Sequence, residues 1–271
     1  MLTTPLASHV PMNRTIVERQ PAYLLHSRPY RDSSALLEIW SRDHGRVGLV
    51  ARGARRAKSP WRGLLDNFQP LSVSWGGKGE LKTLRGLESG PLMTPPVGEA
   101  LAAAYYINEL LLRTCMRQDP HPGLYARYTA MLEVLATDQP FEPQLRYFEL
   151  QLLNELGYGA DFYSDCHGDE LLPSGVYQFV ADQGAVPLLP RDTELNAGDQ
   201  RDDRTREPVG EKVTGRLLMA LAQEQLEDDQ LMAAKRLMRV LLRPHLGNRP
   251  LESRRLWAVY SKLGKTDAVR H

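Results

Sequence analysis

The sequence predicts an α+β fold, with a five-stranded β-barrel followed by an α-helical domain that contains a small turn-rich insert. Two observations support this fold class. Short apolar segments separated by turn residues fill about residues 20–89, whereas longer segments with helical periodicity follow Pro95 and Pro96. The 271 residues suffice for one large or two modest domains. We expect an N-terminal extension, a barrel and a helical domain, at residues 1–18, 19–92 and 93–271 respectively.

Five short segments have the pattern of strands: AYLLHS, SALLEIWS, RVGLVA, PLSVSWGG and ELKTLRGL. The clearest is residues 71–75, where Leu71, Val73 and Trp75 alternate with serines as in a half-buried strand. Glycines in DHGR and GGKGE provide residues that tolerate the positive φ of tight hairpins. Closing five such strands into a barrel removes the exposed sheet edges, so a small barrel is expected.

The remaining chain is predominantly helical. Three helices are expected at 97–118, 123–138 and 142–157, each ending near a proline or glycine. The third has Pro143 in its first turn, where a missing N–H has no cost, and Gly157 at its end. Turns and a hairpin are expected over 160–190 and a mobile charged loop over 191–210, and helices resume from about Glu211 to Leu263.

The formal net charge of +1 conceals a strong asymmetry along the chain. Residues 1–90 carry 14 Lys and Arg against 7 Asp and Glu, residues 91–234 carry 10 against 24, and residues 235–271 carry 10 against 2. Two basic ends therefore flank an acidic middle, which bears on the choice of partners. The two cysteines exclude a disulfide framework, and no signal peptide or membrane-length apolar run is present, so a cytoplasmic protein is expected.

The segment LVARGARRAKSPWRG, residues 49–63, concentrates positive charge beside Trp61 without any acidic residue. Cations neutralise phosphates, and an aromatic ring can stack on a base without reading its identity, so the segment predicts nucleic-acid binding. The competing interpretation is a solvated loop with both tryptophans in the core, and for Trp75 we favour the core. The cations expected to contact nucleic acid from the barrel are Arg46, Arg52, Arg55, Arg56, Lys58, Arg62, Lys78 and Lys82.

A second basic feature lies in the predicted helix at residues 228–247. At 100° per residue, one quadrant of this helix carries Lys235, Arg236, Arg239 and Arg243, opposite an apolar face. Taken alone, an ordinary amphipathic surface helix would be the better interpretation. The arginines that follow, however, favour a basic surface that extends over two elements: Arg249, Arg254 and Arg255.

Catalytic and metal-binding motifs are missing from the sequence. It contains no GxSxG, HExxH or Walker sequence and no GxGxxG after a strand, so we expect no enzyme. Cys166 and His167 lack a second pair to complete four zinc ligands. A magnesium-dependent nuclease is disfavoured because its candidate carboxylates lie in a turn-rich segment, where acids are expected for solvation: Asp161, Asp165, Asp169 and Glu170.

Ordered blocks from about residue 20 to residue 260 resemble the bacterial RecO family of DNA repair proteins. These are YLLHSRPYRDSSALLEIWSRDHGRVGLVARGARR, NFQPLSVSWGGKGELKTLR, YYINELLLR, LRYFELQLLNELGYG and LLRPHLGNRPLESRRL. The resemblance implies an N-terminal OB-fold and a recombination mediator without catalytic chemistry, which binds single- and double-stranded DNA and anneals complementary strands. It implies that RecR, with or without RecF, assists in loading RecA onto DNA coated by single-stranded-DNA-binding protein, in the cytoplasm at the nucleoid. An OB-fold RNA-binding or translation-associated module remains the alternative, because it would share the basic barrel.

The resemblance also implies that the helical domain recognises the acidic, phenylalanine-ending tail of the single-stranded-DNA-binding protein. Arg146 lies in the matching segment LRYFEL, beside Leu150 and Leu153. An exposed arginine bordering an apolar groove could hold a carboxylate while the groove takes an aromatic ring. Without the resemblance, an ordinary helix-surface arginine would be the better interpretation.

The insert at about residues 160–190 departs from the family pattern. Many relatives carry four cysteines there, which form a zinc site, and only Cys166 remains in this chain. We therefore expect a zinc-ribbon-like insert without metal, and no cofactor in the protein. Apolar packing is expected to hold this insert together through Tyr177, Phe179, Val180 and Val186.

Overall fold

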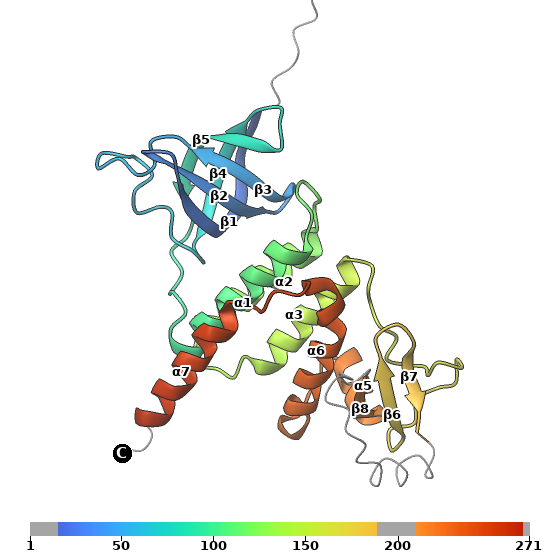
Figure 1. The fold of residues 1–271 in the computed structure, drawn as a ribbon. Coiled ribbons are helices and arrows are strands. Elements are labelled where there is room, and N and C mark those ends of the chain that lie inside the picture. Colours follow the sequence, from blue (N-terminus) through green and yellow to red (C-terminus); the bar gives the residue numbers. More distant parts are fainter. Residues whose placement is uncertain (1–15, 189–209, 268–271) are drawn as a thin grey trace, which may run out of the picture. The chain divides into compact units, whose positions relative to one another are not determined.

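The computed structural model describes residues 16–188 and 210–267 of the chain (Figure 1). These residues form two compact units. Among the described residues, the barrel unit comprises residues 16–92 and 117–120, and the helical unit comprises residues 93–116, 121–188 and 210–267. The expected N-terminal extension lies largely outside the described residues, and the first strand begins at Ile16, within the segment assigned to it.

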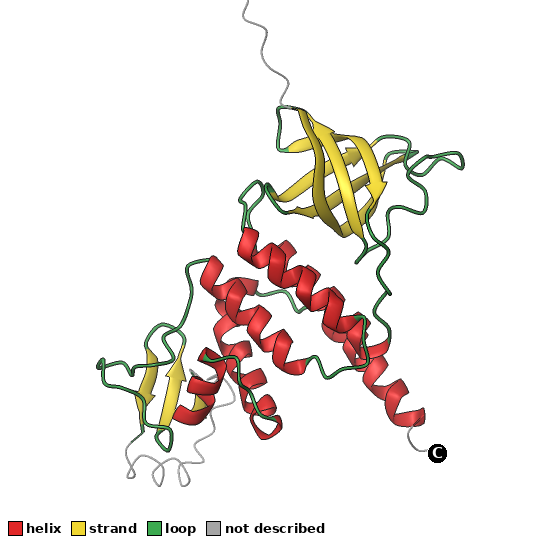
Figure 2. Ribbon diagram, turned by 180° about the vertical axis from the view of Figure 1, so that it is seen from behind, coloured by secondary structure: helices red, strands yellow, loops and turns green. Residues whose placement is uncertain are grey.

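The barrel unit is a closed five-stranded barrel with the strand order β1-β2-β3-β5-β4. Figure 2 shows its strands, in yellow, curving around the barrel. Its strands are β1 (Ile16–Tyr30), β2 (Ser34–Ser41), β3 (Gly45–Ala51), β4 (Pro70–Gly76) and β5 (Leu81–Ser89). The β3–β5 pairing is parallel and every other pairing is antiparallel. The long β1 pairs with both β2 and β4, and its irregularities provide the bending that closure requires. The structure confirms the predicted OB-fold barrel.

The barrel interior follows the alternation that the sequence predicts. Leu71, Val73 and Trp75 are buried on β4 while the serines between them are less so, which confirms the core position of Trp75. Gly45, in the β2–β3 hairpin, has a φ of +61°, and a Cβ atom there would lie 1.8 Å from the carbonyl oxygen of Asp119. Glycine is therefore required at this turn both by the backbone conformation and by the close approach of residues 117–120.

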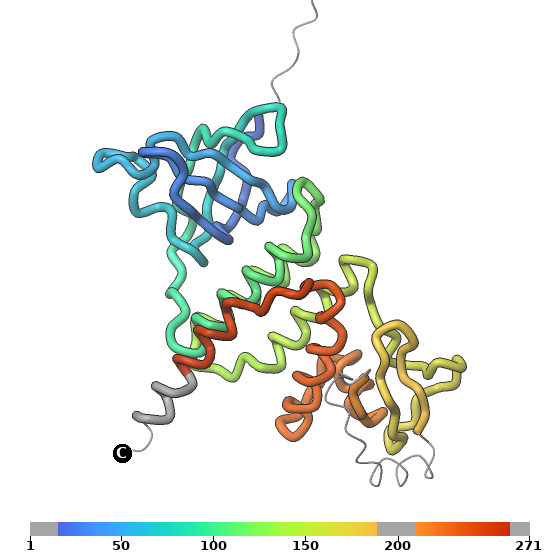
Figure 3. Tube along the Cα trace, viewed as in Figure 1, coloured from blue at the N-terminus to red at the C-terminus, as the bar shows by residue number. Residues whose placement is uncertain are grey.

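In the described part of the helical unit, three α-helices precede the insert and three follow it. They are α1 (Gly98–Thr114), α2 (Pro122–Leu135), α3 (Glu142–Glu155), α5 (Gly215–Ala222), α6 (Leu231–Leu246) and α7 (Ser253–Asp267). The predicted end of α3 is confirmed: Gly157 has a φ of +80°, and the N–H of Tyr158 donates to Leu153 over 2.8 Å. Although far apart in the sequence, α7 lies beside α1 (Figure 3). No described helix is both long enough and apolar enough to cross a membrane.

The insert contributes β6 (Val176–Val180) and β7 (Gly184–Pro187) to a three-stranded sheet of order β7-β6-β8, and the third strand, β8 (Glu211–Thr214), follows it in the chain. The expectation of helix from Glu211 is wrong, because Val213 is buried opposite Tyr177 in the sheet and α5 begins only at Gly215. Thr214 instead caps α5, its hydroxyl accepting from the N–H of Leu217 over 3.3 Å. Most of the expected charged loop at 191–210 lies outside the described residues.

Apolar packing in the insert follows the prediction only in part. Tyr177 and Phe179 are buried, whereas Val180 and Val186 are only partly buried. Phe162 also packs in the insert, with its ring centre 5.6 Å from that of Phe179. The sequence pattern of the hairpin alone does not indicate this contact.

Candidate nucleic-acid interface

The basic loop is the segment that leaves the barrel after β3, and its cations are Arg52, Arg55, Arg56, Lys58 and Arg62. Successive turns shape its backbone, with Arg56 N–H donating to Gly53 over 3.1 Å and Ser59 N–H donating to Arg56 over 3.0 Å. Buried Ala54 belongs to the barrel core, and the partly buried side chain of Trp61 packs against that core. The apolar residues therefore fix the loop to the barrel while its cations stay outside.

All five cations of the basic loop are exposed. Within the described parts of the chain none of them forms an ion pair, so no nearby carboxylate compensates their charge. Arg55 is additionally positioned, because its guanidinium donates to the carbonyl of Arg31 over 3.4 Å and its backbone N–H donates to Ser33 over 2.9 Å. Uncompensated cations on one anchored loop are the electrostatic footprint of phosphate binding.

The other barrel cations differ from one another. Lys78 is exposed in the β4–β5 hairpin and Lys82 is partly buried on β5. Arg46, on β3, has a side chain only 18% exposed, and its Nε atom lies 3.8 Å from a carboxylate oxygen of Glu38. Glu38 also accepts from Arg117, and this hydrogen bond raises the pKa of the Arg117 guanidinium. The charge of Arg46 is therefore largely compensated, which makes it a weaker candidate than the loop cations.

The predicted basic face of α6 divides into two halves. Its opposite face is buried as expected, through Leu237, Met238 and Leu241. Two of its cations are held by carboxylates: Lys235 Nζ lies 3.1 Å from Glu142, and Arg236 Nε lies 2.6 Å from Glu211. The other two, Arg239 and Arg243, line a groove of the helical unit.

The expectation that Arg146 is exposed is wrong. Its side chain is 4% exposed, and Nη1 lies 3.0 Å from Oε2 of Glu149, which is completely buried. The hydroxyl of Tyr106 donates to the same carboxylate over 2.6 Å. Burial raises the pKa of Glu149, although Arg146 and the Tyr106 hydroxyl oppose this shift. Opposite charges three residues apart on one helix were the available signal for this pair.

The three residues expected to dock a partner tail do not share one surface. Leu153 is buried, and Leu150 lines a small cavity with Tyr147 and Phe162. Arg146 instead borders a different pocket of about 310 Å³, lined also by Tyr106, Leu145, Lys235, Arg254 and Trp257. We call this the Arg146 pocket. Lys235 Nζ lies 5.0 Å from the ring centre of Trp257, so the pocket combines apolar walls with cationic groups. Tyr106 and Trp257 were missed because helical periodicity does not reveal which distant helices meet.

Two of the four acidic candidates for a magnesium site, Asp161 and Asp165, stabilise turns. Asp161 accepts hydrogen bonds from the N–H groups of Tyr163 and Ser164, and Asp165 accepts from those of His167 and Asp169. Hydrogen bonds from the Ser164 hydroxyl and from the N–H groups of Tyr163 and Ser164 lower the pKa of Asp161. Across residues 16–188 and 210–260, no three His, Cys, Asp or Glu side chains gather as metal ligands would. The arrangement is one of hydrogen-bonded turns and gives the nuclease alternative no support.

Two family models together match most of the chain. The one described as Recombination protein O N terminal matches residues 12–90, and Recombination protein O C terminal matches residues 96–255. The DNA repair protein RecO of Azoarcus sp. (strain BH72) is 40% identical over 245 residues, covering 89% of this chain and 95% of the relative. That of Alkalilimnicola ehrlichii is 42% identical over 248 residues, covering 91% and 92% respectively. The chain therefore belongs to the RecO family of DNA repair proteins.

Proposed function

We propose that the chain is a recombination mediator that binds single- and double-stranded DNA and anneals complementary strands. In this role it works with RecR, with or without RecF, to load RecA onto DNA coated by single-stranded-DNA-binding protein, in the cytoplasm at the nucleoid. It forms and breaks no covalent bond. The observation that carries the proposal is the basic loop, whose five exposed cations have no carboxylate partner among the described residues.

The mechanism follows from the repulsion between phosphates. Two DNA strands repel each other, and a surface that replaces their counterions by arginine and lysine side chains lowers the cost of bringing them together. Since phosphates rather than base edges are contacted, binding is largely independent of sequence. Trp61 adds a stacking contact only through the part of its ring that the barrel core leaves uncovered.

Replacing Arg55, Arg56 and Lys58 together by alanine tests this function. Affinity for single strands of any sequence should fall, and the slope of log K against log salt should become shallower by about 2, at about 0.7 per lost phosphate contact. Fluorescence anisotropy over a range of salt concentrations measures both quantities. Unchanged affinity and slope would reject the assignment. A clear preference for structured RNA over single-stranded DNA would favour the translation-associated alternative.

We further propose that the Arg146 pocket takes the acidic, phenylalanine-ending tail of the single-stranded-DNA-binding protein. Trp257 and Leu145 offer apolar contact to an aromatic ring, and Arg254, which has no carboxylate partner among the described residues, offers charge to a carboxylate. Arg146 itself is largely engaged by Glu149, so it serves mainly to shape the floor of the pocket.

Trp257→Ala should weaken binding of a synthetic tail peptide at least tenfold, since it removes an aromatic wall of the pocket. Leu256→Ala is the matched control, because Leu256 is the neighbouring residue on α7 and does not line the pocket. Equal affinities of the two variants would contradict the docking site. Annealing on coated DNA, with and without the tail on the coating protein, then tests whether docking matters for the activity.

A further inference from the structure

Four arginines line one groove of the helical unit, whose volume is about 890 Å³. Arg239 and Arg243 come from α6, Arg249 from the connection between α6 and α7, and Arg254 from the first turn of α7. Asp182, in the β6–β7 hairpin, is the one carboxylate among the lining residues. The walls between these charges are mainly aliphatic. The groove is therefore strongly cationic. This holds even though one of its walls, Val180–Asp182, comes from the acidic middle of the sequence.

We propose that this arginine groove binds the phosphodiester backbone of a second nucleic-acid strand. The proposal rests on the proposed function, in which the basic loop of the barrel holds DNA, and it assigns the site at which the helical unit holds phosphates. Annealing requires a protein to retain two phosphate chains, and a separate cationic groove supplies the second binding surface. Guanidinium groups bind phosphate oxygens through paired hydrogen bonds, which favours arginine over lysine in such a groove.

Three of the four arginines in the groove have no carboxylate partner among the described residues. Within residues 16–188 and 210–260, Arg239, Arg249 and Arg254 form no ion pair. Lys235 and Arg236, on the same helix as Arg239, are by contrast held by Glu142 and Glu211. Arg255 also differs from its neighbour Arg254, because it pairs with Glu252 over 3.1 Å and does not line the groove.

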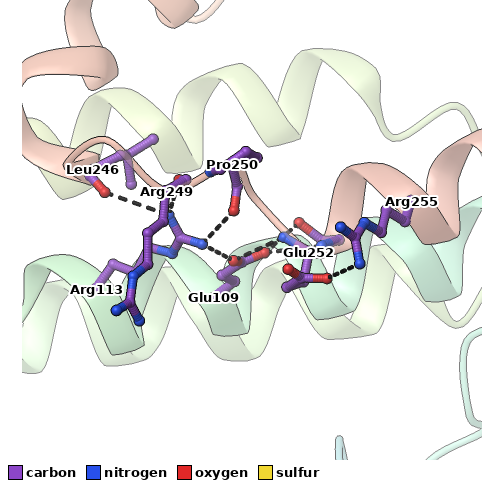
Figure 4. Close-up of polar contacts among 8 residues, drawn as sticks. Glu109, Arg113, Leu246, Arg249, Pro250, Glu252 and Arg255 are labelled. Carbon is purple, nitrogen blue, oxygen red and sulfur yellow. Dashed lines mark hydrogen bonds and ion pairs between the residues drawn. The ribbon is translucent and has the colours of Figure 1, made fainter.

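The backbone that carries Arg249 is held by a clamp on α1 (Figure 4). Arg113 donates to three carbonyl oxygens of the connection, those of Leu246 over 3.4 Å, Arg249 over 2.5 Å and Pro250 over 2.7 Å. Glu109, 2.6 Å from Arg113, accepts from the N–H groups of Glu252 over 3.0 Å and Ser253 over 2.9 Å. The clamp fixes the connection and the start of α7 before any ligand arrives, which lowers the entropy lost on binding.

A nucleic-acid strand fits this groove better than an acidic peptide does. A docked peptide typically binds through an aromatic or other large anchor residue, and the aromatic side chain best placed to contact one, Trp257, lines the adjoining Arg146 pocket and not the groove, although the two share Arg239 and Arg254. Tyr106 is the one aromatic residue that lines the groove, and its hydroxyl is already bonded to Glu149. The groove volume of about 890 Å³ is near the upper end of the volumes of small-molecule pockets. A groove of this size can hold several nucleotides of a nucleic-acid strand.

The test compares Arg249→Ala with Arg255→Ala in the full-length protein. Both changes remove one exposed arginine from the same stretch, but only Arg249 lines the groove. With single-stranded DNA as the probe, Arg249→Ala should make the slope of log K against log salt shallower by about 0.7, and the double variant Arg239→Ala/Arg249→Ala by about 1.4. Arg255→Ala should leave the slope nearly unchanged. Far-UV circular dichroism confirms that each variant is folded.

Two outcomes would overturn the groove assignment. In the first, Arg249→Ala and Arg255→Ala have equal effects on DNA binding. In the second, Arg249→Ala weakens binding of an acidic peptide and leaves DNA binding intact, which makes the groove a peptide site. The basic-loop triple variant, measured in the same assay, separates these failures from failure of the proposed function. If the triple variant loses affinity and Arg249→Ala does not, the function stands and the groove is wrong.

Discussion

The basic loop of the barrel and the basic face of α6 look alike in the sequence and differ in the structure. The loop cations have no carboxylate partner among the described residues, whereas Lys235 and Arg236 are paired with Glu142 and Glu211. Those glutamates lie 93 and 25 residues away in the sequence. A run of one charge therefore indicates free charge where a loop leaves the fold, whereas on a helix that packs against other elements, such as α6, part of the charge is compensated by distant carboxylates.

Arg146 is the extreme case of a compensated cation, so its replacement should give the largest effect on stability. Arg146→Ala leaves the fully buried Glu149 without its ion-pair partner, which should cost about 3–5 kcal/mol of unfolding free energy. Arg55→Ala, in the basic loop, should change stability by less than about 0.5 kcal/mol. Urea unfolding followed by far-UV circular dichroism measures both.

Replacing both partners of this pair provides the control. Arg146→Met combined with Glu149→Gln removes both charges and retains an acceptor for the Tyr106 hydroxyl. The double variant should be more stable than Arg146→Ala, because no buried charge is left unpaired. If Arg146→Ala proved as harmless as Arg55→Ala, the distinction between compensated and free cations would be broken.

The clamp between α1 and the start of α7 should give a smaller and pH-dependent effect. Burial opposes ionisation of Glu109, but hydrogen bonds from Ser253 and Glu252, together with Arg113, lower its pKa overall. Glu109→Ala removes an acceptor for two N–H groups at the start of α7 and should cost about 1–2 kcal/mol at neutral pH. Glu133→Ala, on the exposed face of α2, is the matched control and should be nearly neutral.

The sign of the pH dependence follows from the lowered pKa of Glu109. A carboxyl group whose pKa is lower in the folded state stabilises the fold above its ordinary pKa and loses that contribution as the pH falls through the lowered value. The stability difference between the unaltered protein and Glu109→Ala should therefore be largest near neutral pH and shrink in acid. A difference that stayed constant over the same range would mean that ionised Glu109 does not hold the clamp.

The fold was largely predictable because its signals are local. Alternation in Leu71, Val73 and Trp75 reports one strand whatever surrounds it, and Pro143 and Gly157 mark the two ends of α3. β8 escaped prediction because its four residues acquire strand geometry only by pairing with β6, as Val213 does with Tyr177. Propensity in so short a segment is overridden by this tertiary contact.

The candidate sites were predictable to different degrees for the same reason. Exposure of the basic loop follows from its composition and its position after a strand. The burial of Arg146 depends on Glu149 and on Tyr106 of another helix, and the Arg146 pocket depends on Trp257, more than a hundred residues away. Such contacts are set by how helices pack, which the period of one helix does not encode.

Within the barrel itself, Arg52 and Arg46 allow the same comparison between a cation without a described carboxylate partner and a compensated one. Arg52→Ala should make the salt slope of single-strand binding shallower by about 0.7, since an exposed cation without a described partner is lost. Arg46→Ala should change the slope less, because Glu38 already compensates the charge of Arg46. Anisotropy titrations at several salt concentrations distinguish the two.

Glu38→Gln tests directly whether the carboxylate of Glu38 is what limits the contribution of Arg46 to DNA binding. The change removes the negative charge that Arg46 and Arg117 share, so the net positive charge of this part of the barrel increases and DNA affinity should rise, by about twofold to fivefold. In that background Arg46→Ala should regain an effect on the slope that it lacks in the unaltered protein. If Arg46→Ala were as damaging as Arg52→Ala with Glu38 in place, pairing with a carboxylate would not decide which cations of this barrel bind DNA.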